Sequence, residues 1–246
     1  MNPVQKIKLK YSILFPALLL GMMWASWLIV DASGMDASRF GTLPRSFQGL
    51  IGILTGPFIH DPENLDHILS NSLPMLVLGA FTYYFYRRVA IRVFLWIYLA
   101  HGLLLWCFAR PVVHIGASGL IYGLATFLFA SGIFRRDRSS VAVALVVTFL
   151  YGGMMWGIFP MPNHVSWEAH LFGAVSGVMT AAMYWKVDLP PPPVYDYELE
   201  EEEPETDEEA HAQDNHDGHH PPKPGITVHV HYLPKTHHPH RPHDAL

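Results

Sequence analysis

Six stretches of about 20 predominantly apolar residues limit what the first three quarters of this chain can fold into. They cover roughly residues 12–30, 65–86, 91–109, 116–134, 139–157 and 166–185. Apolar runs of this length are typical of membrane spans. Inside hydrocarbon a segment must satisfy its own backbone hydrogen bonds, which a helix does. The sequence therefore predicts an all-α polytopic membrane protein with a bundle of six transmembrane helices, and it excludes a soluble cytosolic enzyme.

Lysine and arginine predict how these spans are oriented. Ten of them lie before the first span, after the second and fourth, and at the end of the sixth, whereas the other loops hold only Arg39, Arg45 and Arg110. Because positive loops stay inside, both termini are predicted to be cytoplasmic, in a multi-pass protein of a bacterial-type plasma (inner) membrane. The first apolar segment lacks a small-residue cleavage site, so we expect it to be an anchor.

The last 60 residues differ from the rest in composition and charge. Residues 1–186 carry 13 Lys and Arg against 7 Asp and Glu, whereas residues 187–246 carry 3 against 14. Pro190 to Pro193 forms a stiff spacer, and an acidic tract follows at 198–209. Such a composition buries too little apolar surface to order itself. We expect two domains: a transmembrane domain, 1–186, and a cytoplasmic, disordered tail, 187–246.

Histidines in the tail leave a second interpretation open. Ten of the 16 histidines lie between His211 and His243, and pairs such as His219-His220 could bind zinc, copper or nickel weakly. The simpler interpretation is a disordered polar tail. The single cysteine, Cys107, excludes an intramolecular disulfide and a cysteine-rich metal site. No metal, other cofactor or nucleic-acid partner is predicted for the membrane part.

The segment between the first two spans, about 31–64, is apolar in places but too short and interrupted to cross a membrane. We expect an interfacial or re-entrant element on the outer side.

Three spans begin with polar residues, which are costly in a membrane and mark function by default. His67 and Asn71 open the second span, four residues apart and so on one helical face. The fourth opens with Gly116-Ala117-Ser118-Gly119 and the sixth with Glu168-Ala169-His170. In the predicted topology these three spans all run from outside to inside. Their polar residues are therefore expected at one depth, near the outer face.

This set of side chains points to acyl transfer. A serine hydroxyl needs a base to take its proton, and His170 is the base available to Ser118. Donors to the oxyanion would be the backbone N–H of Ser118, the Asn71 amide and a ring N–H of His67. The nearby carboxylates, Asp66 and Glu168, are expected at the water boundary. A Ser–His dyad is therefore favoured over a triad.

Small residues recur at helical spacing on the fourth and sixth spans. Gly119 with Gly123, and Gly173 with Gly177, form Gly-x-x-x-Gly pairs, which allow helices to approach closely in lipid. Such pairs serve packing in most membrane helices. Here they would also bring Ser118 and His170 within hydrogen-bond reach.

Together these residues resemble the rhomboid family of intramembrane serine proteases, over about 40–186. The resemblance implies that Ser118, between Gly116 and Gly119, is the nucleophile and that His170, followed by Gly173 and Gly177, is the base. It implies that His67 and Asn71 line the oxyanion hole. Tyr122 matches the family's aromatic residue that packs on the catalytic imidazole, although ordinary helix packing would also explain it.

The resemblance further implies six helices around a water-filled cavity, transmembrane protein substrates and no cofactor. Many members carry a Trp-Arg pair in the first loop, where this chain has Pro44-Arg45-Ser46.

Two other functions stay open at the level of sequence. One is a catalytically silent binder of transmembrane helices that keeps the fold. The other is a metal-handling membrane protein, suggested by the histidine-rich tail. His101 and His114 are interpreted as packing and loop residues.

Overall fold

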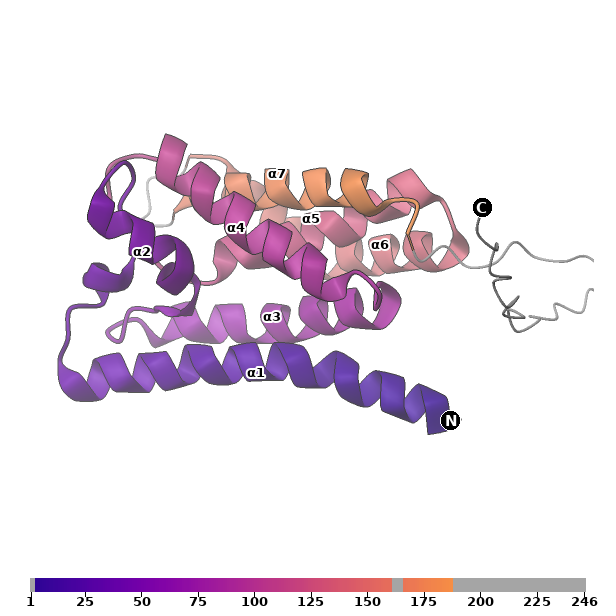
Figure 1. Cartoon of the computed structure of the whole chain (residues 1–246), viewed down its shortest axis with the longest axis horizontal. Helices are drawn as coiled ribbons and strands as arrows, with labels where there is room; N and C mark the ends of the chain where they lie inside the picture. The colour runs from indigo at the N-terminus through magenta and orange to yellow at the C-terminus, as the bar shows by residue number, and fades with distance from the viewer. Residues whose placement is uncertain (1–2, 161–165, 188–246) are drawn as a thin grey trace, which may run out of the picture. The chain divides into compact units, whose positions relative to one another are not determined.

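Seven α-helices and three short 3₁₀ helices make up residues 3–160 and 166–187, the part of the chain that the computed structural model describes (Figure 1). The α-helices are α1 (Pro3–Ser33), α2 (Phe47–Thr55), α3 (Leu65–Phe85), α4 (Ala90–Phe108), α5 (Ser118–Arg135), α6 (Arg138–Tyr151) and α7 (Trp167–Tyr184). The 3₁₀ helices are η1 (Ala37–Phe40), η2 (Gly56–Phe58) and η3 (Gly152–Ile158). All but the first residue of the predicted tail domain lies outside the described residues.

The described part of the chain is all-helical, as predicted, with one α-helix more than the six expected spans. The additional helix, α2, lies in the segment 31–64. Within residues 3–160 and 166–187, five helices are long and apolar enough to cross a membrane: α1, α3, α4, α5 and α6 continued by η3. α7 is not among them, because its first turn carries Trp167, Glu168 and His170. The protein is thus a multi-pass membrane protein, and a sixth crossing by α7 stays a prediction.

α5 occupies the centre of the helix bundle. It packs against α3, α4 and α6, and most extensively against α7. In its most apolar 18-residue window 61% of the residues are buried, against 17% for α1, which packs along α3 at the edge (Figure 1). The residue that opens α5, Ser118, is therefore placed between several neighbouring helices.

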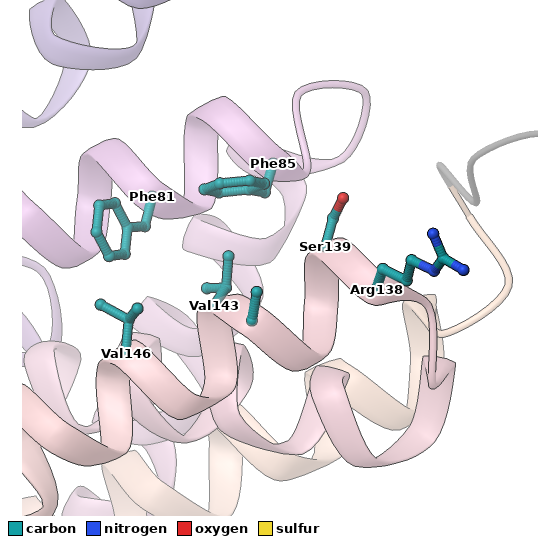
Figure 2. Close-up of a pocket in the computed structure, with 7 residues that line it drawn as sticks. Phe81, Phe85, Arg138, Ser139, Val143 and Val146 are labelled. Atoms are coloured by element: carbon teal, nitrogen blue, oxygen red, sulfur yellow. The ribbon is translucent and has the colours of Figure 1, made fainter. Parts of the chain in front are cut away.

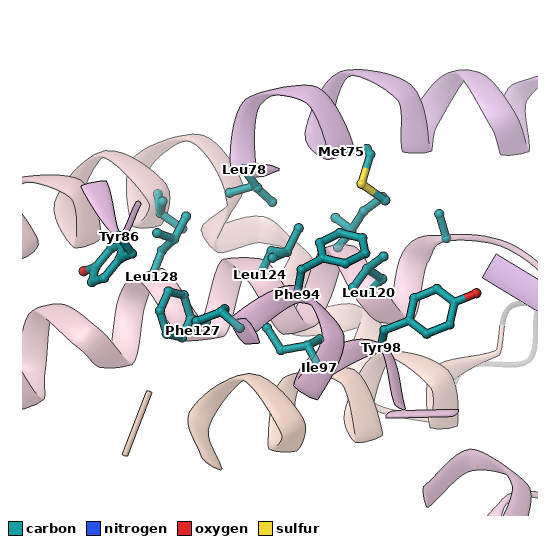
Figure 3. Close-up of a cluster of buried hydrophobic side chains, with 14 of the residues drawn as sticks. Met75, Leu78, Tyr86, Phe94, Ile97, Tyr98, Leu120, Leu124, Phe127 and Leu128 are labelled. Carbon is teal, nitrogen blue, oxygen red and sulfur yellow. The ribbon is translucent and has the colours of Figure 1, made fainter. Parts of the chain in front are cut away.

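The apolar core lies where α3, α4 and α5 meet (Figure 3). Leu78, Ile97 and Leu124 have no exposed surface there. On the outside of α6, by contrast, Leu145 is 65% exposed and Phe149 is 88% exposed. Large apolar side chains on the outer surface are what lipid tails accommodate, so in a bilayer the helices are held together by close packing rather than by the hydrophobic effect.

The first loop is fastened to the end of α4 and to the loop before α5. The indole Nε1 of Trp106 donates to the carbonyl of Ser46 at 2.9 Å, and the Arg45 guanidinium donates to the carbonyl of Ala109 at 2.8 Å. Thr42 and His114 exchange backbone hydrogen bonds of 2.8 and 2.9 Å. These bonds hold α2 and η2 beside the segment that leads into Ser118.

Candidate active site

Ser118 is the first residue of α5, and a tight backbone turn precedes it. Gly116 has φ +105°, a conformation that residues with a side chain rarely adopt, and its N–H donates to the carbonyl of Gly56 at 3.0 Å. A Cβ at Gly116 would come within 2.5 Å of His67 Nε2. Glycine is therefore required at this turn both for its conformation and for its small size.

His170 lies in the first turn of α7, and its ring reaches across to α5. Its Nε2 is 2.9 Å from Ser118 Oγ, and its Nδ1 is 2.9 Å from the carbonyl oxygen of Gly157 in η3. A carbonyl oxygen can only accept, so Nδ1 carries the ring proton. Nε2 is then the unprotonated nitrogen and accepts the Ser118 hydroxyl proton. This is the arrangement that a general base requires.

Tyr122 holds the face of the His170 ring. The two rings stack at a centroid distance of 4.1 Å and an interplanar angle of 6°. The Tyr122 hydroxyl donates to the carbonyl of Met154 at 2.7 Å. Its packing on the imidazole is the role that the resemblance implies.

The glycines on α5 and α7 interlock. A Cβ at Gly173 would overlap the carbonyl oxygen of Gly119, and a Cβ at Gly177 would overlap that of Gly123. Side chains at these positions would force the two helices apart. The expectation that the paired glycines bring Ser118 and His170 together agrees with this geometry.

His67 and Asn71 lie at the turn that precedes Ser118, on the side of Gly116. The Asn71 amide donates to His60 Nε2 at 3.1 Å. Among the described residues no hydrogen bond joins His67 or Asn71 to Ser118 or His170. The structure thus places both side chains near the turn before Ser118, without a hydrogen bond to the dyad in the described residues.

His60 is a site residue that the sequence analysis did not include. It has no exposed surface, its ring lies 4.9 Å from the His67 ring, and its Nε2 accepts from Asn71. Its Nδ1 donates to the carbonyl of Phe58 at 3.3 Å. Burial, and then the neighbouring His67, lower the pKa of His60 to about 4, so it is neutral at pH 7. A neutral His60 orients the Asn71 amide.

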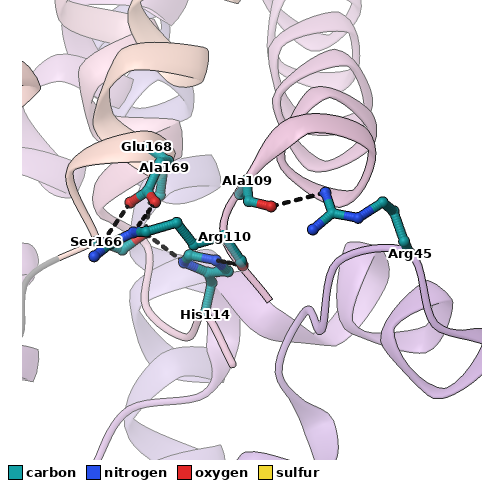
Figure 4. A network of polar contacts seen from close by, with 7 residues as sticks. All are labelled: Arg45, Ala109, Arg110, His114, Ser166, Glu168 and Ala169. Carbon is teal, nitrogen blue, oxygen red and sulfur yellow. Dashed lines mark hydrogen bonds and ion pairs between the residues drawn. The ribbon is translucent and has the colours of Figure 1, made fainter. Parts of the chain in front are cut away.

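A polar network joins the start of α7 to the loop before α5 (Figure 4). Arg110 Nη2 donates to Glu168 Oε2 at 2.9 Å, and His114 Nδ1 lies 2.6 Å from the Ser166 hydroxyl, which accepts from the N–H of Ala169. The Glu168 side chain is only 4% exposed and is covered by its ion pair with Arg110, and its expected position at the water boundary stays a prediction. His114, interpreted from the sequence as a loop residue, also belongs to this network through its contact with Ser166.

His101 of α4 reaches the same region from a third helix. Its ring lies against Gly119, where a Cβ would overlap it, and it is 3% exposed. Neither of its ring nitrogens has a hydrogen-bond partner within the described ranges.

Metal ligands are not grouped in the described residues: no three His, Cys, Asp or Glu side chains there could hold an ion. The histidine-rich tail proposed as a weak metal binder lies outside them.

Comparisons with known proteins show the family of the chain. The model of the Rhomboid domain matches residues 48–187, more than half of the chain. Uncharacterized proteins of Mycobacterium bovis and Mycobacterium tuberculosis are each 36% identical over 167 residues, which is 63% of this chain and 67% of theirs. One from Mycobacterium leprae is 34% identical over 145 residues, 54% of this chain and 55% of its own length. The chain belongs to the rhomboid family, which consists in general of intramembrane proteases of the serine type.

Proposed function

We propose that this protein is an intramembrane serine endopeptidase that cleaves the transmembrane segments of membrane-anchored proteins near the outer membrane face. The observation that carries the proposal is the line of contacts from Ser118 Oγ to His170 Nε2 and from His170 Nδ1 to the carbonyl of Gly157. It supplies a nucleophile, a base and a group that fixes the tautomer of the base.

In the proposed mechanism, Ser118 Oγ attacks the scissile carbonyl carbon while its proton passes to His170 Nε2. His170 then returns the proton to the leaving amine, and an acyl-enzyme on Ser118 remains. Water, activated by the same nitrogen, hydrolyses the ester and frees the second product. No carboxylate is needed, because the Gly157 carbonyl orients the imidazole.

The oxyanion would be held by the backbone N–H of Ser118 and by side chains on α3. Asn71 has a second N–H besides the one it gives to His60, and the His67 ring lies beside Gly116. One donor of this kind is worth about a hundred- to a thousandfold in rate where it is well placed.

The predicted topology completes the proposal. Six spans, with both termini in the cytoplasm of a bacterial-type cell, would place Ser118 and His170 near the outer face of the plasma membrane. The lipid bilayer and transmembrane substrates are then the partners of the domain.

Fluorophosphonate labelling of the purified full-length protein in detergent tests the proposal. We expect the parent to be labelled, and Ser118→Ala and His170→Ala to be unlabelled with unchanged thermal unfolding. Ser131→Ala is the matched control, because Ser131 is a buried serine on the same helix. Labelling should be accompanied by cleavage of a model transmembrane substrate by the parent and the control.

Two results would count against a protease. A well-folded parent that neither reacts with the probe nor cleaves, yet retains transmembrane peptides, would identify a catalytically silent binder. Equal labelling of Ser118→Ala would place the reactive serine elsewhere.

A further inference from the structure

The hydrogen bonds at the start of α7 form a chain with a defined direction that ends in the loop before α5 (Figure 4). The N–H of Ala169 donates to the Ser166 hydroxyl at 3.3 Å, which is the N-cap contact of α7. That hydroxyl lies 2.6 Å from His114 Nδ1, and His114 Nε2 lies 3.2 Å from the carbonyl oxygen of Arg110. Because a carbonyl oxygen only accepts, Nε2 carries the ring proton. Nδ1 then accepts from the Ser166 hydroxyl.

The burial of His114 supports this arrangement of protons. The residue is 3% exposed, and burial is the largest cause that lowers its pKa. The neighbouring charges of Glu168 and Arg110 act on this pKa in opposite directions. The ring is therefore neutral at pH 7 and offers an unprotonated nitrogen to Ser166.

The backbone of His114 is fixed relative to Ser118. Thr42 donates to the His114 carbonyl at 2.8 Å, and the His114 N–H donates to the Thr42 carbonyl at 2.9 Å. Ser118 follows four residues later, after the turn at Gly116, whose N–H donates to the carbonyl of Gly56. The first loop thus holds both the imidazole of His114 and the segment that carries the nucleophile.

On α7 the constraint reaches His170 within one helical turn. The N–H of His170 donates to the Ser166 carbonyl at 3.4 Å, and its ring Nε2 is 2.9 Å from Ser118 Oγ. A shift of Ser166 would carry the first turn of α7 with it. The distance between His170 Nε2 and Ser118 Oγ would change as a result.

The ion pair between Arg110 and Glu168 joins the same loop to the same turn, but it fixes their positions less closely. The Arg110 side chain is 56% exposed. An ion pair that solvent reaches contributes little, and a long arginine side chain can follow a small movement of its partner. We therefore assign the closer constraint to the buried contact between His114 and Ser166.

Apolar contacts between helices constrain position less closely still. Across the groove between α3 and α6, for example, Phe81 and Phe85 face Val143 and Val146 (Figure 2). Such contacts have no preferred direction, so they tolerate small shifts of one helix along another. A hydrogen bond weakens steeply when its angle changes. The start of α7 is therefore held in one position by its bond to His114.

We propose that His114 is a positioning residue of the dyad. Its ring holds Ser166, and with it the first turn of α7, so that His170 Nε2 stays within reach of Ser118 Oγ. Among the described residues His114 has no hydrogen bond to either dyad residue, so it acts through Ser166. The inference rests on the proposed function, because it assigns His114 a part in the same reaction.

The rate of fluorophosphonate labelling of the full-length protein in detergent tests this role, together with kcat and KM for a model transmembrane substrate. His114→Leu fills the space of the ring and removes the acceptor. We expect it to lower the labelling rate and kcat by about tenfold to a hundredfold, since a misplacement of about 1 Å can cost that much. KM should change little. His114→Asn should restore most of the loss, because its Oδ1 can accept from Ser166 in place of Nδ1.

Thr180→Val is the matched control. Thr180 is a buried residue of α7, and its hydroxyl donates to the carbonyl of Ser176 in the same helix at 2.7 Å. It lies about 15 Å along the helix from His170. We expect this variant to be labelled and to turn over substrate like the parent. Unfolding temperatures establish that each variant is folded.

¹⁵N NMR of the histidine rings gives a second measurement, which does not depend on turnover. We expect His114 to be protonated at Nε2 and His170 at Nδ1, and substitution of each residue identifies its signals. Ser118→Ala supplies the reference for a His170 ring without its contact to the hydroxyl. In His114→Leu the Nε2 signal of His170 should shift toward that reference.

Three results would overturn the inference. Labelling of His114→Leu at the rate of the parent would show that the ring does not position the dyad. Equal losses in His114→Leu and His114→Asn, with a matching fall in unfolding temperature, would make His114 a packing residue. A His114 ring protonated at Nδ1 would remove the acceptor for Ser166.

Failure of the proposed function would look different. A folded parent that the fluorophosphonate does not label would contradict the protease. The ¹⁵N signal of His170 in His114→Leu would still decide whether His114 positions that ring.

Discussion

Tyr122 and Gly157 hold the His170 ring from two directions, one at its face and one at its edge. The ring stack of 4.1 Å fixes the plane of the imidazole, and the Gly157 carbonyl fixes its rotation within that plane. The Tyr122 hydroxyl and the Nδ1 proton both go to carbonyls of η3. The contributions of the stack and of the hydroxyl can be separated by mutation.

We expect Tyr122→Leu to lower kcat by about threefold to tenfold, because an aromatic stack is worth about 0.5–1.5 kcal/mol. Tyr122→Phe keeps the stack and loses only the bond to Met154, so its kcat should stay within about threefold of the parent. Turnover of a model transmembrane substrate checks both. Equal losses in the two variants would assign the effect to the hydroxyl.

His60 should make stability depend on pH. Its pKa is about 4 in the folded protein and 6.5 in an unfolded chain. Between these values the unfolded chain binds more protons, so stability is full above about pH 6.5 and falls as the pH drops toward 4. Protonation of Nε2 would also remove the acceptor of the Asn71 amide.

Thermal unfolding in detergent from pH 4 to 7 tests this dependence. We expect the unfolding temperature of the parent to drop over that window and that of His60→Gln to drop less. Burial is the chief cause that lowers the pKa of His114. His114 is present in both proteins, so its contribution to the pH dependence of the unfolding temperature is the same in both. Parallel curves for parent and variant would show that His60 is not the titrating group.

At the scale of helices, the α5–α7 contact positions the dyad. Gly173 meets the backbone of Gly119 so closely that Gly173→Ala must push the helices apart. We expect it to cost about 1–3 kcal/mol of stability and to abolish fluorophosphonate labelling. Gly21→Ala is the control, because α1 leaves open space at Gly21 and alanine favours helices. Labelling that survives in a destabilised Gly173→Ala would separate packing from catalysis.

Most helix boundaries could be predicted because hydrocarbon requires long apolar runs. The segment predicted at 65–86 is α3, Leu65–Phe85, and that at 91–109 is α4, Ala90–Phe108. The bounds of α2 within 31–64 could not be predicted from the sequence. α2 has nine residues and is held by contacts with α4 and η1, so it gives no apolar run of span length. The last part of the fifth segment is η3, a change of helix type to which hydropathy is insensitive.

The contact between Ser118 and His170 could be predicted, because both side chains lie at the starts of long helices. Gly157 acts through its carbonyl, which every residue possesses, so no sequence pattern marks it. His60 lies in an irregular stretch seven residues before His67, and helical spacing says nothing about such a pair. The His114 ring contacts the hydroxyl of Ser166, 52 residues later in the chain, and its backbone pairs with that of Thr42. No local sequence pattern indicates either partner.

For the whole molecule, the arginine distribution predicts that the end of the bundle with Arg87, Arg88 and Arg138 faces the cytoplasm. In a Cys107→Ser background, a cysteine introduced at position 36 should react with a membrane-impermeant maleimide on intact cells, and one at position 88 should react only after lysis. Permeabilised cells supply the control for both positions. Labelling at 88 in intact cells would invert the topology and place Ser118 at the inner face.

The Gly157 carbonyl also has an electrostatic consequence for a protein that lies across a bilayer. An aspartate in its place would put a fixed negative charge among membrane-spanning helices, where an unpaired ion is costly to bury. A carbonyl selects the same tautomer with a neutral dipole, so the resting dyad has no net charge. In the proposed protease, this carbonyl would therefore stabilise the imidazolium less than a carboxylate would, while it keeps the resting dyad neutral among membrane helices.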